Sequence, residues 1–322
     1  MNEEQVLKRI ASGAKAARLS AAGVHLGIGD DAALFAPRAG RETILTCDWS
    51  LEGTHFLRDK HPADAVGWKS LARAVSDVAA MGGTPRCYLL SLALPASHTG
   101  RWLGEFLCGL RRASRDFRCE LAGGDTTRRD EILINIAVAG EIAPGQALRR
   151  TGARAGDLIF VSGRLGEADR GWERLQKTRG KVRADDPLLR KHLYPEPRLA
   201  LGEWLAKNGL ATAAMDLSDG LSIDLLRLCA ASGVGARLEI ASLPMMQDVG
   251  REKAVKLALH GGDDYELLFA VAPRKAHHIP KRFRGLQLTP IGRILRGKKI
   301  EVRAENGRVY RLRPGGWDPF RK

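Results

Sequence analysis

Residues 211–233 read ATAAMDLSDGLSIDLLRLCAASG, a stretch that predicts a strand, an acidic turn and a helix in succession. The apolar run that ends at Met215 is typical of a strand, and residues 216–220 (DLSDG) follow it directly. Apolar residues at helical spacing come next, and Gly233 provides the expected stop. This order places two aspartates where a strand gives way to a helix.

The first half of the chain repeats this kind of pattern. Residues 43–47 predict a strand that ends at Asp48, and residues 64–81 predict a helix that Gly82 and Gly83 end. Asp77 therefore lies one turn before the end of that helix. Further strands are expected at residues 88–94, 132–139, 157–161, 234–240 and 265–271, with a helix at residues 101–117.

Length and composition favour two globular domains of the α/β (α+β) class. The chain has 322 residues, of which 44% are hydrophobic, and it contains 36 glycines and 14 prolines. A basic stretch after Pro144-Gly145 marks the expected boundary. We predict an N-terminal domain at residues 1–143 and a C-terminal domain at residues 144–322.

The cysteines and the first residues predict a cytoplasmic protein without a membrane segment. The five cysteines are odd in number, widely spaced, and show no zinc-ligand spacing. The chain starts MNEEQVLKRI, where acidic residues stand in place of the basic ones of a signal peptide, and no apolar run of 18 residues follows.

The formal net charge of +15 raises a second hypothesis, a protein that binds nucleic acid or another polyanion. Basic residues dominate residues 148–198 and 274–322. No helix-turn-helix, zinc-finger or RNA-recognition signature accompanies them, so we do not expect a nucleic-acid partner. Retention on heparin, compared with thermal stabilisation by Mg-ATP, discriminates between the two hypotheses.

Aspartates beside glycine or serine recur along the chain and predict a magnesium site. Mg²⁺ prefers a few carboxylates together with phosphate oxygens and water, and neighbouring glycines let backbone N–H groups approach a phosphate. Each segment alone is typical of an ordinary turn. The segments are residues 29–31 (GDD), 76–77 (SD), 123–125 (GGD) and 218–220 (SDG).

Common nucleotide-binding motifs are absent. Residues 27–32 (GIGDDA) match a G-x-G-x-x-A fingerprint, but their two aspartates would face a pyrophosphate directly. The sequence contains neither a Walker A segment nor the glycine-rich and H-R-D loops of protein kinases. An ATP-dependent enzyme with this sequence needs another fold.

Seven ordered segments across nearly the whole chain resemble the thiamine-monophosphate kinase family. That family belongs to the superfamily of aminoimidazole ribonucleotide synthetase and selenophosphate synthetase. The resemblance implies a two-domain fold of that superfamily, whose N-terminal sheet pairs across a homodimer and whose C-terminal domain is α/β. The segments are GIGDDAALF, TCDWSLEGTHF, ARAVSDVAAMGGTPR, LAGGDTTR, RTGARAGDLIFVSGRLG, MDLSDGL and HGGDDYELLFA.

The resemblance implies Mg-assisted transfer of the ATP γ-phosphoryl group to thiamine monophosphate, giving thiamine diphosphate. Such a transfer depends on positioning and charge neutralisation. By motif, several Mg²⁺ ions would be held by Asp30, Thr46, Asp48, Asp77, Asp125, Asp216 and Asp219, of which Asp125 and Asp219 matter most for catalysis. ATP would contact Asp30, Gly124, Arg150 and Ser218, and the substrate would contact His55, Asp263 and Trp317.

Two positions depart from the family, and other ATP-dependent enzymes of the superfamily remain an alternative. Asp263 stands where the family usually has Glu, so its carboxylate is one methylene shorter. Cys47 stands where a hydroxyl residue is commoner, and because a thiol is a poor Mg²⁺ ligand, coordination there would fall to the backbone or to Thr46.

Overall fold

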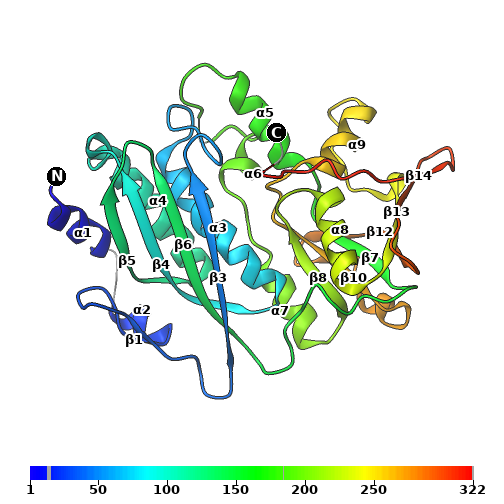
Figure 1. Ribbon diagram of the computed structural model, residues 1–322, viewed down its shortest axis with the longest axis horizontal. Coiled ribbons are helices and arrows are strands. Elements are labelled where there is room, and N and C mark those ends of the chain that lie inside the picture. Colours follow the sequence, from blue (N-terminus) through cyan, green and yellow to red (C-terminus); the bar gives the residue numbers. More distant parts are fainter. Residues whose placement is uncertain (13–15, 184, 321–322) are drawn as a thin grey trace. The chain divides into compact units, whose positions relative to one another are not determined.

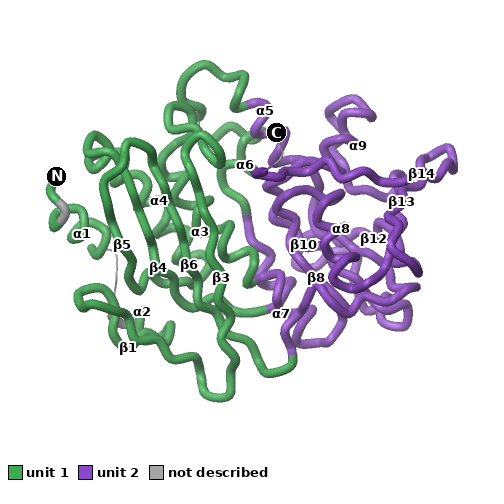
Figure 2. Tube along the Cα trace, viewed as in Figure 1, with its two compact units in different colours: residues 1–78, 83–145, 175–195 green, residues 79–82, 146–174, 196–322 purple. Residues whose placement is uncertain are grey.

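The computed structural model describes residues 1–12, 16–183 and 185–320, which fall into two compact units (Figure 2). Unit 1 contains Met1–Val78, Gly83–Gly145 and Leu175–Pro195, and unit 2 contains Ala79–Gly82, Gln146–Arg174 and Glu196–Lys322. Each unit combines one main sheet with helices, which confirms the α/β class expected from the sequence. The sequence did not suggest that Ala79–Gly82 belong to unit 2 and Leu175–Pro195 to unit 1.

Unit 1 is built on a four-stranded sheet in the order β3-β6-β4-β5 (Figure 1). The β3–β6 and β6–β4 pairs are antiparallel, and the β4–β5 pair is parallel. Two long helices, α3 and α4, lie against one face of this sheet (Figure 1). The elements are β3 (Glu42–Leu51), β4 (Thr84–Leu94), β5 (Glu120–Arg128), β6 (Leu133–Ile142), α3 (Ala63–Ala80) and α4 (Arg101–Phe117).

Helix packing in unit 1 follows from residue spacing and from two glycines. The buried residues of α4 recur every three or four positions, so one stripe of the helix faces the core. A Cβ on Gly67 of α3 would collide with the carbonyl oxygen of Phe106, and a Cβ on Gly109 of α4 would collide with that of Asp64. Only glycine lets the two backbones approach so closely.

Smaller elements complete unit 1. A two-stranded sheet formed by β1 and β2 precedes β3 in the sequence. These elements are α1 (Glu3–Ala11), α2 (Ala16–Ala21), β1 (Val24–Leu26), β2 (Leu34–Phe35), η1 (Ala96–His98) and α6 (Arg190–Leu193).

Unit 2 is built on a sheet in the order β14-β13-β9-β12-β7-β10-β8, with β11 paired to β12. Consecutive residues of β10 point to opposite faces and enter two separate cores, because side chains alternate along a strand. Leu268 packs into the core with helices α8 and α9, whereas Leu267 and Phe269 pack into the core with α7. The run of six buried residues in β10 is therefore covered on both sides.

The strand and the helix that open the sequence analysis are both present in unit 2. The predicted strand and helix at residues 211–233 are β8 and α8, and Gly233 is the left-handed C-cap with φ of 69°. The elements are β7 (Leu158–Ser162), α5 (Glu167–Lys177), α7 (Leu199–Lys207), β8 (Ala211–Leu217), α8 (Leu221–Ser232), β9 (Gly235–Glu239), η2 (Ile240–Ser242), α9 (Arg251–His260), β10 (Glu266–Val271), η3 (Pro273–His278), β11 (Arg282–Phe283), β12 (Leu286–Leu295), β13 (Ile300–Arg303) and β14 (Val309–Arg311).

One prediction about a site residue needs correction. Asp48 was expected at the end of a strand, but β3 continues to Leu51, so Asp48 lies within the strand. The strand continues because β3 stays paired with β6 over its whole length, from Glu42 to Leu51.

In the described part of the chain, no helix has both the length and the apolarity that a membrane crossing requires.

Candidate active site

Strand β3 and helix α3 bring three of the predicted metal ligands of unit 1 together. The Thr46 hydroxyl donates a hydrogen bond to Oδ2 of Asp77 at 2.5 Å. The Arg73 guanidinium donates to Oδ1 of Asp48 at 3.0 Å. Two residues along a strand and four residues along a helix cover nearly the same distance, about 6–7 Å. This match aligns Thr46 with Asp77 and Asp48 with Arg73.

Asp125 and Gly124 lie on the opposite edge strand, β5. Strand register places Trp49, Asn135, Ser91 and Asp125 in one row across the sheet. Residues in one row share a face, so Asp125 belongs to the open face of the sheet, whereas Asp48 contacts α3 on the other face. The sheet does not bring Asp125 to Asp48.

Gly124 has a backbone that other residues rarely adopt. Its φ is 153°, and a Cβ at this position would collide with the carbonyl oxygen of Leu90 on β4. A glycine is therefore required for β5 to pair with β4 here. Gly124 and Asp125 are both exposed, so this part of β5 is accessible to a ligand.

The remaining predicted residues of unit 1, Asp30 and His55, lie in loops. Asp30 is exposed after β1, and its Oδ1 accepts the backbone N–H of Asp31 at 2.9 Å. Nδ1 of His55 accepts the backbone N–H of Leu51 at 3.0 Å. A neutral imidazole whose Nδ1 accepts carries its proton on Nε2, so Nε2 of His55 is a hydrogen-bond donor.

In unit 2, three loops meet and bring four predicted residues together. The backbone N–H of Asp263 donates to the carbonyl oxygen of Ser218 at 2.7 Å, and that of Trp317 donates to the carbonyl oxygen of Asp219 at 2.9 Å. Gly316 makes this approach possible, because a Cβ there would collide with the Asp219 carbonyl oxygen. Ser218, Asp219, Asp263 and Trp317 thus belong to one cluster of turns.

Asp219 is part of a compact charge network at the start of α8. Its carboxylate pairs with Arg227, which also contacts Asp224 at 2.9 Å. The Asp224 carboxylate accepts the backbone N–H groups of Asp219 and Gly220, both at 3.0 Å, and burial raises the pKa of Asp224 to about 6. Asp224 therefore fixes the backbone of the turn that carries Asp219.

Asp216 and Arg150 differ in their surroundings. Asp216 lies in β8 with only 4% of its surface exposed. Arg150 is exposed, and its carbonyl oxygen accepts the Ser232 hydroxyl at 2.8 Å. Ser232 ends α8, which spans about 18 Å, whereas Asp219 precedes the helix. The Arg150 backbone is thus remote from the cluster of turns.

No three His, Cys, Asp or Glu side chains form a metal-binding group among residues 1–12, 16–183 and 185–320. Within each unit, the predicted ligands occur instead as small sets, one of which is Thr46, Asp48 and Asp77. Their convergence on shared ions stays a prediction.

Two arginines that bind predicted metal ligands were not singled out in the sequence. Arg73 pairs with Asp48, and Arg227 pairs with Asp219. Their spacing offered a signal, since Arg73 lies four residues before Asp77 and Arg227 lies three residues after Asp224 on predicted helices. Each arginine neutralises a carboxylate that a cation would otherwise compensate.

Asp169, in the first turn of α5, predicts a pH-dependent stability. Burial, together with the negative charges of Glu173 and Asp263, raises the pKa of Asp169 from 3.8 to about 6. The folded state therefore binds a proton more tightly than the unfolded chain between these pH values. The stability that this proton contributes is present below about pH 4 and is lost as the pH rises to about 6.

Asp169→Asn should accordingly leave the free energy of unfolding nearly unchanged at pH 4 and raise it by roughly 1–3 kcal/mol at pH 7. Thermal melts from pH 4 to pH 8 measure the difference. Asp59→Asn, at an exposed aspartate of unit 1, is the control. A difference between Asp169→Asn and wild type that does not vary with pH would contradict the assignment.

Comparison with known proteins gives a consistent result over most of the chain. The family profile "AIR synthase related protein, N-terminal domain" matches residues 29–142, and "AIR synthase related protein, C-terminal domain" matches residues 154–305. Thiamine-monophosphate kinase of Escherichia coli (strain K12) is 38% identical over 311 residues, 94% of each chain.

Solved structures agree with the sequence comparison. The crystal structure of thiamine-monophosphate kinase from Stenotrophomonas maltophilia K279a superimposes with a TM-score of 0.81 at 38% identity, over 94% of this chain and 96% of that one. The structure of AaThiL complexed with AMPPCP and TMP superimposes with a TM-score of 0.76 at 34% identity, over 91% and 92%.

Proposed function

Because the chain belongs to the thiamine-monophosphate kinase family, we infer that it transfers the γ-phosphoryl group of ATP to thiamine monophosphate, giving thiamine diphosphate. The observation that carries this inference is the similarity, over more than 90% of the chain, to a structure complexed with AMPPCP and TMP. Both substrates of the reaction have a counterpart there. ATP is the co-substrate.

We propose that Mg²⁺ ions assist the transfer, and the donor chemistry of the site supports them. The candidate ligands are carboxylates and one hydroxyl, which are hard oxygen donors. Mg²⁺ commonly uses one or two carboxylates and completes its octahedron with phosphate oxygens and water. Small sets such as Thr46, Asp48 and Asp77 therefore suit metal that arrives with a nucleotide.

The protein's own residues would position the reactants. Gly124 is exposed beside Asp125, and the exposed guanidinium of Arg150 can bind two phosphate oxygens at once. On the acceptor side, we propose that Nε2–H of His55, the carboxylate of Asp263 and the ring of Trp317 contact thiamine monophosphate. Trp317 is 49% exposed, so its ring is available for stacking.

We further propose that the protein is a cytoplasmic homodimer. The face of the unit 1 sheet opposite α3 and α4 carries three exposed apolar side chains, Leu45, Trp49 and Leu89, with exposures of 77%, 51% and 44%. A second copy that covered this face would remove them from water. The cytoplasmic location is proposed from the sequence, whose five cysteines are widely spaced and odd in number.

A coupled assay tests the proposed reaction. With ATP, Mg²⁺ and thiamine monophosphate, the wild-type protein should form ADP and thiamine diphosphate in equal amounts. Replacing thiamine monophosphate with an unrelated nucleoside monophosphate should abolish turnover, because His55, Asp263 and Trp317 would lose their contacts. Equal rates with both acceptors, or no thiamine diphosphate, would refute the proposal.

A further inference from the structure

The turn that carries Asp263 has an unusual backbone. Asp263 and Tyr265 both have positive φ, 64° and 51°, and a bulky side chain such as tyrosine rarely adopts this conformation. Strained residues persist only where the surrounding structure holds them, and they gather at functional sites. The backbone N–H of Tyr265 donates to the carbonyl oxygen of Leu217 at 2.8 Å, which ties the turn to the end of β8.

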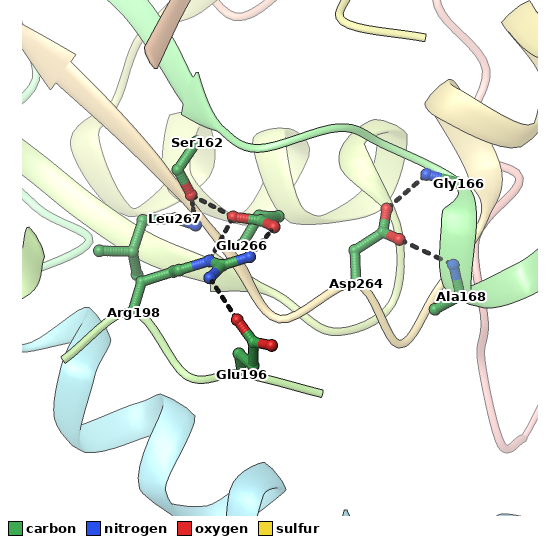
Figure 3. A network of polar contacts seen from close by, with 8 residues as sticks. All are labelled: Ser162, Gly166, Ala168, Glu196, Arg198, Asp264, Glu266 and Leu267. Atoms are coloured by element: carbon green, nitrogen blue, oxygen red, sulfur yellow. Dashed lines mark hydrogen bonds and ion pairs between the residues drawn. The ribbon is translucent and has the colours of Figure 1, made fainter. Parts of the chain in front are cut away.

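Asp264 holds one side of this turn. Its carboxylate accepts the backbone N–H of Gly166 at 2.6 Å and that of Ala168 at 3.3 Å, at the start of α5 (Figure 3). Asp264 is 9% exposed, and burial raises its pKa well above the ordinary value. Two backbone donors fix both oxygens, so Asp264 cannot turn toward a ligand.

Glu266 holds the other side. Its carboxylate accepts the Ser162 hydroxyl at 2.5 Å and Nε of Arg198 at 2.7 Å, and it also pairs with Nη2 of Arg198 (Figure 3). Glu266 is 1% exposed. The residues on both sides of Tyr265 are therefore fixed, and the Tyr265 side chain has no freedom to move away.

Tyr265 itself points to the residue that the proposed function assigns to the substrate. Its hydroxyl donates a hydrogen bond to Oδ1 of Asp263 at 2.8 Å, while its ring is buried with 1% exposure. The rigid phenol thus occupies one carboxylate oxygen of Asp263 and restricts rotation of that carboxylate. Asp263 is only partly buried.

We propose that Tyr265 is a positioning residue for substrate recognition: its hydroxyl fixes the Asp263 carboxylate in the orientation that contacts the cationic thiamine moiety. This inference rests on the proposed function. It extends that function by one residue, which acts through Asp263 and makes no substrate contact of its own.

The test is Tyr265→Phe, which removes the hydroxyl and keeps the ring. Loss of a hydrogen bond to a charged group should raise KM for thiamine monophosphate about tenfold, with kcat and KM for ATP changed less than about twofold. In an Asp263→Ala background, Tyr265→Phe should have no further effect on KM, because the oriented group is gone.

Tyr88→Phe is the matched control. Tyr88 is also buried, and its hydroxyl lies 2.9 Å from the Ser114 hydroxyl in unit 1. This variant should lose thermal stability to a similar degree and keep the wild-type KM for thiamine monophosphate. A purely structural hydroxyl at Tyr265 would lower the melting temperature without the selective change in KM.

The possible failures are distinguishable. A wild-type protein that does not phosphorylate thiamine monophosphate overturns the proposed function, and this inference with it. An active wild type combined with an unchanged KM in Tyr265→Phe overturns the inference alone. The inference is also overturned if Tyr265→Phe raises KM for thiamine monophosphate equally in the wild-type and the Asp263→Ala backgrounds.

Discussion

Asp219→Asn and Asp125→Asn should each lower kcat for thiamine diphosphate formation by about 10²–10³-fold while the protein stays folded. Each substitution keeps the shape of the side chain and removes a negative charge that would bind Mg²⁺ beside the phosphates of ATP. Steady-state kinetics and thermal melts of the purified variants measure both quantities.

The control for Asp219→Asn must also lose an ion pair with arginine. Asp248→Asn meets this need, because Asp248 pairs with Arg170 in unit 2 and lies outside the predicted site. It should keep wild-type kcat. If Asp125→Asn and Asp219→Asn both turned over like wild type, the metal-site proposal would be wrong.

Glu266→Gln should destabilise the protein by about 3–5 kcal/mol, a larger loss than most single substitutions cause. Arg198 is 11% exposed and Glu266 is 1% exposed, so the neutral variant leaves a buried guanidinium whose remaining carboxylate partner is the half-exposed Glu196, at 3.5 Å. The corresponding fall in melting temperature is roughly 6 °C or more.

An exposed pair provides the comparison. Glu305→Gln breaks the contact between Arg251 and Glu305, whose side chains are 52% and 54% exposed. Exposed ion pairs are worth about 0–1 kcal/mol, so its melting temperature should hardly change. Similar melting temperatures for Glu266→Gln and Glu305→Gln would show that the buried pair contributes little.

Local patterns predicted the elements that they directly encode. The helix expected at residues 64–81 is α3, because its apolar spacing and the following glycine pair are both local signals. The helix at residues 101–117 has its predicted bounds for the same reason. Strands at residues 88–94 and 132–139 were placed correctly, although β4 and β6 extend beyond them.

Other elements were not predicted, because tertiary context decides them. Helices α5 and α7 were not predicted: α5 (EADRGWERLQK) has few apolar residues, and α7 (LALGEWLAK) is a short, largely apolar run that does not by itself distinguish a helix from a strand. Strand β12 contains Pro290, which argues against an interior strand. It nevertheless lies between β7 and β9, with a register shift between Pro290 and Gly292 that accommodates the proline.

In the candidate site, too, local motifs predicted the residues, whereas long-range contacts decide how they are arranged. Its residue types were read from motifs, and four of them do meet in the turns of unit 2. Sequence spacing could not show that Asp48 and Asp125 lie on different faces of one sheet, since the register of β3, β6, β4 and β5 depends on long-range pairing. Nor could it show that Tyr265 reaches Asp263, in a turn where both residues have positive φ.

We propose that separate acidic turns bind divalent cations that hold the phosphates of ATP. Crystals grown with Mn²⁺ and AMPPCP test it most directly, because anomalous scattering locates the manganese ions. We predict anomalous peaks bridging phosphate oxygens to carboxylates among Asp30, Asp48, Asp77, Asp125, Asp216 and Asp219, at roughly the 2.0–2.2 Å of hard-cation coordination. Bound nucleotide with no manganese beside any of these carboxylates would contradict the claim.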